Sequence, residues 1–384
     1  MARGTGGGVS RRRFLQLAGV GAGLAAFGGF APRAWADHTT GVVKPTPPQL
    51  FFTRGTNREM KWEAMKNHGY LTGIDRFFVR NHTTTPHINP STWRLRIEGT
   101  GVTTPVDLTL DDILDLPAVT LTKFIECAGN GRSFFATVPG RPASGTQWLL
   151  GAIGVAQWTG VRLADVLDLA GLKSTAVDVM PTGLDTQAVR RPIPIEKALD
   201  GDTLLVYGMN GQALPEDHGF PVRVLTPGWI GIANIKWVGK IEVSETPLFS
   251  KWNTTLYRFF GEAYPDSPVL YDQQPKSALE IPLPATLPAG KQELTGRSWS
   301  PFDRIKHVEV SFDGGSQWKK AKLEKTNSAG TWVEWSIKWD PSPGSYGIRV
   351  RAEEKAGNSQ PDSVPFNDQG YLYWAVVDHP VTVV

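Results

Sequence analysis

Apolar and polar residues alternate over short stretches along most of the chain, which is the pattern of half-buried β-strands. Residues 93–99 alternate and end at a glycine, and Ile235–Val243 follow the same pattern. Each of these segments is therefore predicted to form one strand of a sheet with one face in the core.

Two segments change from this alternation to helical spacing. Residues 108–114 place apolar side chains three and four positions apart, and Thr109 has a hydroxyl that suits an N-cap. Residues 161–169 repeat this pattern and stop before Gly171. Glycine and proline interrupt residues 37–271 throughout, so we expect an α+β fold with long loops.

The pattern changes beyond a Pro-rich passage that runs from Pro265 to Pro288. Strand-like runs then recur about every ten residues. They are His307–Phe312, Trp318–Leu323, Thr331–Trp339 and Tyr346–Ala352. The sequence Asp-Gly-Gly-Ser at 313–316 predicts a hairpin turn between the first two runs. Regular short strands with glycine turns favour an immunoglobulin-like β-sandwich.

Residues 1–36 have the composition of an export signal. Arginines at 11–13 precede Phe14 and Leu15, a glycine-rich apolar stretch follows, and Ala34-Trp35-Ala36 offers small residues for cleavage. The arginine pair indicates the twin-arginine route, so we expect a periplasmic or other extracytoplasmic location. A single membrane anchor is the alternative, but the apolar run is short and diluted by glycine. We expect no membrane span after processing.

Setting this leader aside changes the charge balance of the chain. The 384 residues include 40 Lys plus Arg and 37 Asp plus Glu, and five of the arginines lie in the leader. The body therefore has 35 basic and 37 acidic residues, a net charge of −2. A near-neutral body lacks the basic surface that binds phosphate backbones, so nucleic acid is not expected as a partner.

Cys127 is the only cysteine, which excludes internal disulfides and zinc or iron–sulfur sites built from several thiolates. Residues 124–132 read Phe-Ile-Glu-Cys-Ala-Gly-Asn-Gly-Arg. The glycines let the backbone approach a bulky group, and Arg132 offers a cation that favours the thiolate form. Three roles are compatible with this spacing: a soft metal ligand, a buried structural cysteine, or a nucleophile.

Two further segments concentrate polar side chains. Residues 77–82 (Phe-Phe-Val-Arg-Asn-His) place Arg80 and His82 two positions apart, so both point the same way if the segment is the end of a strand. Residues 210–223 are dense in glycine, proline and polar donors. Taken alone, the first segment is compatible with an ordinary surface pair and the second with a structured loop.

Together these three segments resemble the molybdopterin-binding domain of the sulfite oxidase family. The resemblance covers nearly the whole chain after the leader and includes residues 151–153 (Gly-Ala-Ile), 158–163 (Trp-Thr-Gly-Val-Arg-Leu) and 234–241 (Asn-Ile-Lys-Trp-Val-Gly-Lys-Ile). The C-terminal strands resemble the family's immunoglobulin-like dimerisation domain. We therefore expect a twin-arginine signal peptide (1–36), a molybdopterin-binding domain (37–272) and an immunoglobulin-like domain (273–384) that forms a homodimer.

The resemblance also implies roles for individual residues. Cys127 is expected to be the one protein ligand to molybdenum, whose other sulfur ligands come from molybdopterin. The other residues expected to bind the cofactor and its phosphate are Phe78, Arg80, Asn81, His82, Asp185, His218, Arg223, Ile235 and Lys236. The residues expected to line the substrate pocket are Arg80, Arg132, Trp148 and Tyr207. Guanidinium groups suit an oxyanion, and a tyrosine hydroxyl can orient it or relay a proton.

The implied activity is oxidation of sulfite or a related sulfur oxyanion. Electrons are expected to pass to an external acceptor such as a c-type cytochrome, since the chain has no Cys-x-x-Cys-His haem site. One departure bears on the substrate: Gln369, before Gly370, stands where animal and plant sulfite oxidases have an arginine. Three alternatives stay open: a sulfane dehydrogenase-like activity, reduction of nitrate or another oxyanion, and a secreted binding protein that has lost catalysis.

Overall fold

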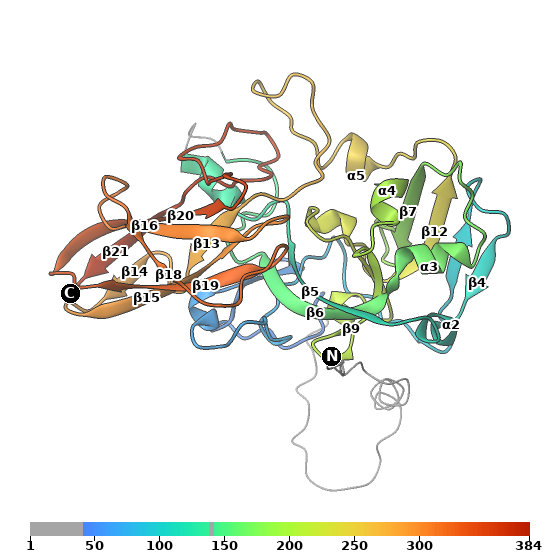
Figure 1. Ribbon diagram of the computed structural model, residues 1–384, viewed down its shortest axis with the longest axis horizontal. Coiled ribbons are helices and arrows are strands. Elements are labelled where there is room, and N and C mark those ends of the chain that lie inside the picture. Colours follow the sequence, from blue (N-terminus) through green and yellow to red (C-terminus); the bar gives the residue numbers. More distant parts are fainter. Residues whose placement is uncertain (1–40, 138–141) are drawn as a thin grey trace, which may run out of the picture.

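The computed structural model describes residues 41–137 and 142–384. Figure 1 shows two parts side by side, an N-terminal part that carries the short helices and a C-terminal part made of strands. The export signal predicted at 1–36 lies outside the described residues. Within them, no helix combines the length and the apolar character needed to cross a membrane.

The N-terminal part contains two five-stranded sheets. The first has the strand order β10-β9-β6-β5, and β11 also pairs with β9. Its strands are β5 (Val119–Glu126), β6 (Ile153–Arg162), β9 (Leu204–Met209), β10 (Gln212–Ala213) and β11 (Arg223–Leu225). The second has the order β4-β3-β12-β7-β8, in which only β3 and β12 run parallel. Its strands are β3 (Leu95–Glu98), β4 (Val106–Leu108), β7 (Asp178–Gly183), β8 (Ile193–Pro194) and β12 (Val238–Ser244). The strands predicted at 93–99 and 235–243 are thus confirmed as β3 and β12.

The helices are short, so the fold is mostly β. They are α2 (Leu110–Leu114), α3 (Leu163–Asp168), α4 (Ile195–Ala198) and α5 (Lys251–Thr254), with short 3-10 helices at Trp62–Met65, Arg132–Thr137, Glu216–His218 and Gly231–Ala233. Thr109 caps α2 as predicted, because its hydroxyl accepts a hydrogen bond from the Asp112 amide at 3.2 Å. The helix predicted at 161–169 begins only at Leu163, since Val161 and Arg162 continue β6. The α+β expectation therefore overstated the helical content.

The C-terminal part consists of two sheets that face each other. The four-stranded sheet has the order β13-β15-β19-β18 and the five-stranded sheet the order β14-β21-β20-β16-β17. Their strands are β13 (Lys276–Leu279), β14 (Ala285–Leu287), β15 (Gln292–Trp299), β16 (Ile305–Ser311), β17 (Lys319–Lys320), β18 (Lys322–Leu323), β19 (Trp332–Trp339), β20 (Gly344–Glu354) and β21 (Asp378–Val383). Apolar side chains from both sheets form one core, with Trp335 of β19 and Val350 of β20 among them.

Most strands predicted in this part are confirmed, as β16, β19 and β20. The single strand predicted at Trp318–Leu323 is wrong. Its first half forms β17, which pairs with β16, and its second half forms β18, which pairs with β19 of the other sheet. The alternating pattern hid this crossing because both halves keep the same period of two.

Two segments pack buried aromatic side chains against the part of the molecule to which they do not belong in sequence. Near the N-terminal end of the described chain, the hairpin of β1 (Phe51–Arg54) and β2 (Asn57–Met60) is followed by Trp62, which packs against Trp299 of β15. Later in the chain, the loop between β20 and β21 returns to the N-terminal part, where Tyr371 stacks on Tyr257 with ring centroids 4.9 Å apart. Residues distant in sequence therefore complete both parts.

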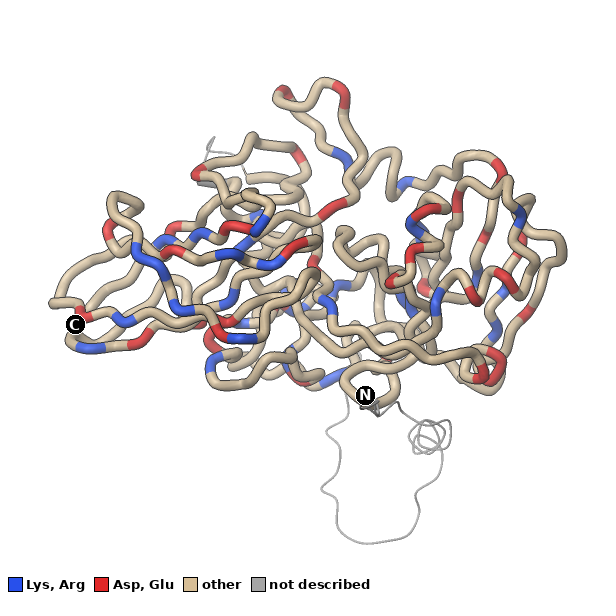
Figure 2. The backbone as a smooth tube through the Cα atoms, viewed as in Figure 1, with Lys and Arg blue, Asp and Glu red and all other residues tan. Residues whose placement is uncertain are grey.

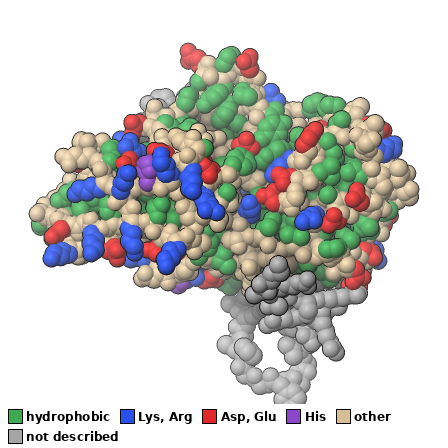
Figure 3. All heavy atoms as spheres, viewed as in Figure 1, with side chains coloured by type: hydrophobic (Ala, Val, Ile, Leu, Met, Phe, Trp, Pro, Cys, Tyr) green, Lys and Arg blue, Asp and Glu red, His purple; other side chains and the backbone are tan. Residues whose placement is uncertain are grey.

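Charged residues of both signs are interspersed along the chain (Figure 2). On the face shown in Figure 3, Lys and Arg side chains gather over the C-terminal part. In the C-terminal part, Lys306 pairs with Glu353 and Arg351 with Glu309, each at 2.7 Å. Part of its positive charge is therefore neutralised by adjacent carboxylates.

Candidate active site

Cys127 lies directly after β5, where the chain leaves the sheet. Its amide donates a hydrogen bond to the Ala152 carbonyl at 2.9 Å, which keeps the turn against the start of β6. Its side chain is 7% exposed, and its Sγ accepts a hydrogen bond from the Gly129 amide at 3.4 Å. A Cβ at Gly129 would lie 2.7 Å from the Arg132 guanidinium, so the glycine is needed for Arg132 to fold over this turn. The turn presents a thiol and a cation together.

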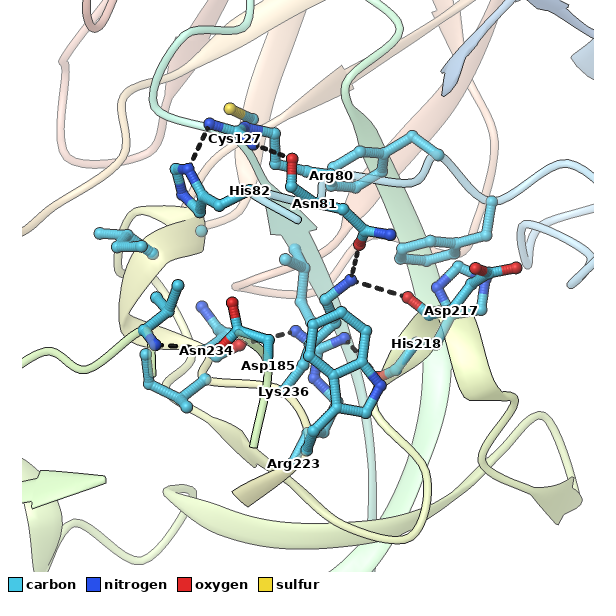
Figure 4. Close-up of a pocket in the computed structure, with 18 of the residues that line it drawn as sticks. Arg80, Asn81, His82, Cys127, Asp185, Asp217, His218, Arg223, Asn234 and Lys236 are labelled. Carbon is cyan, nitrogen blue, oxygen red and sulfur yellow. Dashed lines mark hydrogen bonds between the residues drawn. The ribbon is translucent and has the colours of Figure 1, made fainter. Parts of the chain in front are cut away.

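A pocket of about 720 Å³, including its open mouth, extends from Cys127 into the N-terminal part (Figure 4). All ten residues predicted to bind the cofactor line it. They are Phe78, Arg80, Asn81, His82, Cys127, Asp185, His218, Arg223, Ile235 and Lys236. Cys127, Arg80 and His82 lie at one end, and Arg223 and Lys236 lie at the other. The sequence motifs therefore converge on one cavity.

The far end of this pocket is built from buried cationic groups. Lys236 Nζ donates to the Asp217 carbonyl at 2.8 Å and to Asn81 Oδ1. Burial, followed by repulsion from Arg223, lowers the pKa of Lys236 well below its usual value. Burial also lowers the pKa of Arg223 to about 9 and, with the neighbouring cations, lowers the pKa of His218 well below its usual value. The Asp217 and Asp185 carboxylates offset the mutual repulsion of these basic groups only in part.

Two buried donors at this end have no hydrogen-bond partner. They are Nε of Arg223 and Nε2 of His218, whereas the other two guanidinium nitrogens of Arg223 donate to the carbonyls of His218 and Asn234 at 3.0 Å. Arg223 Nε is a donor, and His218 Nε2 is one in the tautomer that carries its proton there, so a phosphate at this end would satisfy both. The donor set therefore fits the phosphate of an elongated cofactor whose other end reaches Cys127.

The walls of this pocket also hold residues that the sequence reasoning did not single out. Asp217 accepts hydrogen bonds from the Val43 and Lys44 amides at 3.0 and 2.7 Å, which fixes this irregular segment against the pocket. Asn234 Oδ1 accepts from the Thr226 amide at 2.9 Å. Asp217 lies in the segment 210–223 and Asn234 in the segment 234–241. Each is next to a residue that was predicted to bind the cofactor, His218 or Ile235, and this adjacency could have indicated that both line the pocket.

A second pocket, of about 880 Å³ including its mouth, opens on the other side of Cys127. Arg80, His82, Cys127 and Tyr257 line both pockets, so the two meet at the thiol. Arg132, Gln369 and Tyr371 line only the second pocket, together with Ser144, Gly145, Thr146, Gln187, Lys251, Trp252 and Leu256. Arg80 and Arg132, which were predicted to line the substrate pocket, therefore share one cavity with Gln369.

The two arginines are held by backbone and side-chain acceptors. Arg132 Nε donates to the Gln369 carbonyl and Nη1 to the Thr146 carbonyl, each at 2.8 Å. Arg80 Nη1 donates to Asn57 Oδ1 at 3.3 Å, and Nη2 contacts His82 Nδ1 at 3.0 Å. The segment around Arg80 is not the predicted strand, since only Val79 forms an isolated bridge. Arg80 and His82 nevertheless point the same way.

His82 and Tyr257 form a hydrogen-bonded pair whose proton positions follow from their surroundings. Burial, with a contribution from Arg80, lowers the pKa of His82 to about 2, so the imidazole is neutral. Arg80 can only donate, so Nδ1 accepts and the proton of His82 sits on Nε2. Nε2 lies 3.4 Å from the Tyr257 hydroxyl oxygen. The Tyr257 proton is then free to point into the second pocket.

Two residues predicted to line the substrate pocket lie elsewhere. Tyr207 is buried in the core between the two N-terminal sheets with Leu205, whereas Leu204 and Val206 face the core that contains Cys127. Side chains alternate along a strand, so Tyr207 of β9 points away from the thiol. Trp148 is fully buried behind Phe78, with ring centroids 6.4 Å apart, and supports the wall without lining it.

Two other tyrosines, Tyr257 and Tyr371, line the second pocket. Tyr257 has a φ of 55°, an uncommon value for a residue with a Cβ, and it directs the ring into the pocket. Burial raises the pKa of both Tyr257 and Tyr371, so both hydroxyls keep their protons. Both lie in loops rich in glycine and proline, where hydrophobic periodicity gives no signal.

Comparisons with known proteins agree with this geometry. Residues 82–252 match the family described as oxidoreductase molybdopterin binding domain, and residues 273–379 match the Mo-co oxidoreductase dimerisation domain. Sulfite oxidase of Gallus gallus is 36% identical over 319 residues, which cover 77% of this chain and 69% of that protein. Mitochondrial sulfite oxidase of Homo sapiens is 35% identical over 319 residues, and the match spans 58% of its length and 77% of this chain.

A solved structure supports the same assignment at the level of the fold. The sulfane dehydrogenase SoxCD from Paracoccus pantotrophus superposes with a TM-score of 0.76 and 26% sequence identity, covering 85% of this chain and 86% of that chain. Matching domain models, relatives that cover most of the chain, and a pocket lined by all ten expected cofactor residues lead to one conclusion. The chain belongs to the sulfite oxidase family of molybdopterin-dependent oxidoreductases.

Proposed function

We propose that this protein oxidises sulfite or a related sulfur oxyanion and passes the electrons to an external acceptor, such as a c-type cytochrome. The observation that supports this proposal is the second pocket, which Arg80 and Arg132 line together with Cys127. Two guanidinium groups in one half-enclosed cavity favour a small oxyanion over a neutral ligand.

The chain's own residues bind and orient that substrate. Arg132 keeps its position through the Gln369 and Thr146 carbonyls, so its remaining nitrogen can donate to an anion without reorganisation. Arg80 and the Tyr257 hydroxyl approach from the side of His82. When bound through Cys127, the molybdenum cofactor supplies two-electron redox chemistry with oxygen-atom transfer.

The identity of the oxyanion depends on the charge of this pocket. Gln369 donates through Nε2 to the Thr255 carbonyl at 3.0 Å and adds no cation. A pocket with fewer cations binds a dianion less tightly, while a singly charged substrate loses less. A sulfane dehydrogenase-like activity is therefore the second candidate. The two candidates differ in the charge of the substrate that the pocket must bind, since sulfite oxidation requires binding of a dianion.

Reduction of the molybdenum centre tests the proposal directly. Purified protein should contain about one molybdenum per chain and should be reduced by sulfite in stopped-flow absorption measurements, with ferricyanide or a c-type cytochrome as oxidant. Faster reduction by thiosulfate or a sulfane-sulfur compound would favour the second candidate. Turnover with nitrate alone would favour an oxyanion reductase, and protein without molybdenum would favour a binding function that has lost catalysis.

We further propose that the protein is exported by the twin-arginine route to a periplasmic or other extracytoplasmic location. The arginines at 11–13 support this, and replacing Arg11 and Arg12 by lysine should block export of the full chain. We also propose that the C-terminal sandwich has the immunoglobulin-like topology and holds two chains in a homodimer, as the matched dimerisation domain suggests. Light scattering after size-exclusion chromatography should give twice the chain mass.

A further inference from the structure

Glu126 precedes the thiol and is bonded to the C-terminal part of the molecule. It is fully buried, and each of its carboxylate oxygens has a partner in the four-stranded sheet of that part. Oε1 lies 2.7 Å from Nζ of Lys276 in β13, and Oε2 accepts a hydrogen bond from Nε1 of Trp299 in β15 at 3.0 Å. Glu126 ends β5, so the sandwich contacts the sheet of the cofactor domain next to Cys127.

The same sheet also holds the turn that follows the thiol. Lys276 Nζ donates a second hydrogen bond, to the Asn130 carbonyl at 3.0 Å. The Asn130 side chain donates to Glu126 Oε1 at 2.9 Å and accepts from the Ala152 amide at 2.9 Å. Gln273 Nε2 donates to the Glu126 carbonyl at 2.7 Å. Residues on both sides of Cys127 are thus fixed from behind, while the thiol faces the pockets.

The burial of this network makes it sensitive to the loss of one member. Lys276 is 1% exposed and Glu126 is 0% exposed, so water cannot replace a missing partner. Removing the Lys276 ammonium would leave the Glu126 carboxylate without its counter-charge, directly beside the turn that carries Cys127. We expect the turn to shift so that this carboxylate moves towards water. A shift of the turn necessarily moves the Sγ of Cys127.

We propose that Lys276 and Glu126 are positioning residues, through which the C-terminal domain fixes the Cys127 thiolate in the orientation that the cofactor requires. The inference depends on the family's cofactor and not on which sulfur compound is oxidised. A merely structural ion pair would add stability to the interface between the two parts and leave the thiol's environment unchanged. The two roles can be separated because Cys127 is the only thiol of the chain.

Alkylation of Cys127 measures its environment without turnover. The full chain is produced without the cofactor, and the rate of reaction with iodoacetamide is followed by mass spectrometry under native conditions. In the wild type the thiol is 7% exposed and should react slowly. Lys276→Met should raise this rate at least tenfold in folded protein. Combining Lys276→Met with Glu126→Gln should return the rate towards that of the wild type, because the double variant has no unpaired charge.

The cofactor-loaded enzyme gives a second readout. There, Lys276→Met should lower kcat more than it raises KM, and it should shift the sulfur-to-metal absorption band.

Arg297→Met provides a matched control. Arg297 and Glu280 form another ion pair of the same sheet, at 2.7 Å and with 1% and 6% exposure, and Arg297 also donates across the two parts to the Tyr70 carbonyl at 3.0 Å. It does not contact the Cys127 turn, so Arg297→Met should lower stability with less than a twofold change in alkylation. The alkylation rates of Lys276→Met and Arg297→Met are compared at temperatures at which the same fraction of each variant is folded. An equal increase of the rate in both variants would overturn the proposal.

A milder variant covers the case in which Lys276→Met does not fold. Trp299→Phe removes the donor to Glu126 Oε2 and shortens a fully buried side chain, but it keeps the Lys276–Glu126 ion pair and retains an aromatic ring against Trp62. It should accelerate alkylation about threefold or more and should shift the absorption band in the same direction as Lys276→Met. Wild-type alkylation rates and an unshifted band in folded Trp299→Phe would also refute the positioning role.

Discussion

Replacing Tyr257 by phenylalanine tests the pocket at its most informative position. The change removes one hydroxyl and keeps the ring, which stacks on Tyr371 at 4.9 Å, so the fold should be retained. If the hydroxyl donates to an anionic substrate, the lost hydrogen bond is worth about 1.5–3 kcal/mol. Because each 1.4 kcal/mol corresponds to about a factor of ten, kcat/KM should fall about 10- to 150-fold.

Tyr207→Phe is the matched control for this variant. Tyr207 has the same chemical group but lies in the core between the two sheets, on the opposite face of β9 from the thiol. Its kcat/KM should stay within about twofold of the wild type. The assay is steady-state reduction of ferricyanide by sulfite and by thiosulfate, with molybdenum content measured in each preparation so that rates refer to loaded enzyme.

The pH dependence adds an independent check on Tyr257. Burial raises its pKa above the ordinary value of about 10, so the hydroxyl remains a donor throughout the neutral range. Activity should therefore show no loss from ionisation of this group below about pH 10. A larger effect from Tyr207→Phe than from Tyr257→Phe, or an unchanged kcat/KM in the latter, would refute the assignment of the substrate pocket.

Four further outcomes are expected. Cys127→Ser should abolish turnover of every sulfur compound while circular dichroism stays unchanged, and residual turnover above about 1% would contradict metal ligation by this residue. Arg223→Met should lower the molybdenum content of purified protein several-fold, because a buried phosphate donor is lost. Burial lowers the pKa of His218, so unfolding of the cofactor-free chain takes up a proton at this residue below about pH 6.5. The free energy of unfolding should therefore fall as the pH decreases below that value, with about 1.4 kcal/mol per pH unit from His218 alone, and His218→Asn should remove this contribution. Gln369→Arg should lower the KM for sulfite, and an unchanged KM would show that this position does not face the anion.

The cofactor site could be predicted from the sequence because its residues lie in motifs of unusual composition. Phe78 to His82 and His218 to Lys236 are distant along the chain, yet both segments line the pocket beside Cys127. Their roles came from resemblance to a family, and spacing alone left the thiol with three possible roles. The structure adds the physical reason, which is a set of buried donors without partners.

The residues that line the second pocket could be predicted only in part. Tyr207 was named from the family resemblance, and because β9 is buried on both faces, no alternation in the sequence could show that this side chain points away from the thiol. Tyr257 and Tyr371 were missed because they belong to loops, whose conformation depends on tertiary contacts. The pairing of Lys276 with Glu126 joins residues 150 positions apart, and no local pattern reports such a contact.

The hydrogen bond from Arg132 to the Gln369 carbonyl spans 237 residues, and this separation has a consequence for biosynthesis. The turn that carries the thiol leaves the ribosome long before the loop that closes its neighbouring pocket, and domains fold in that order. A nascent chain therefore exposes an unshielded cysteine until the second sandwich sheet has formed. Maturation in a reducing compartment, before any transport, would protect that sulfur from oxidation during this interval.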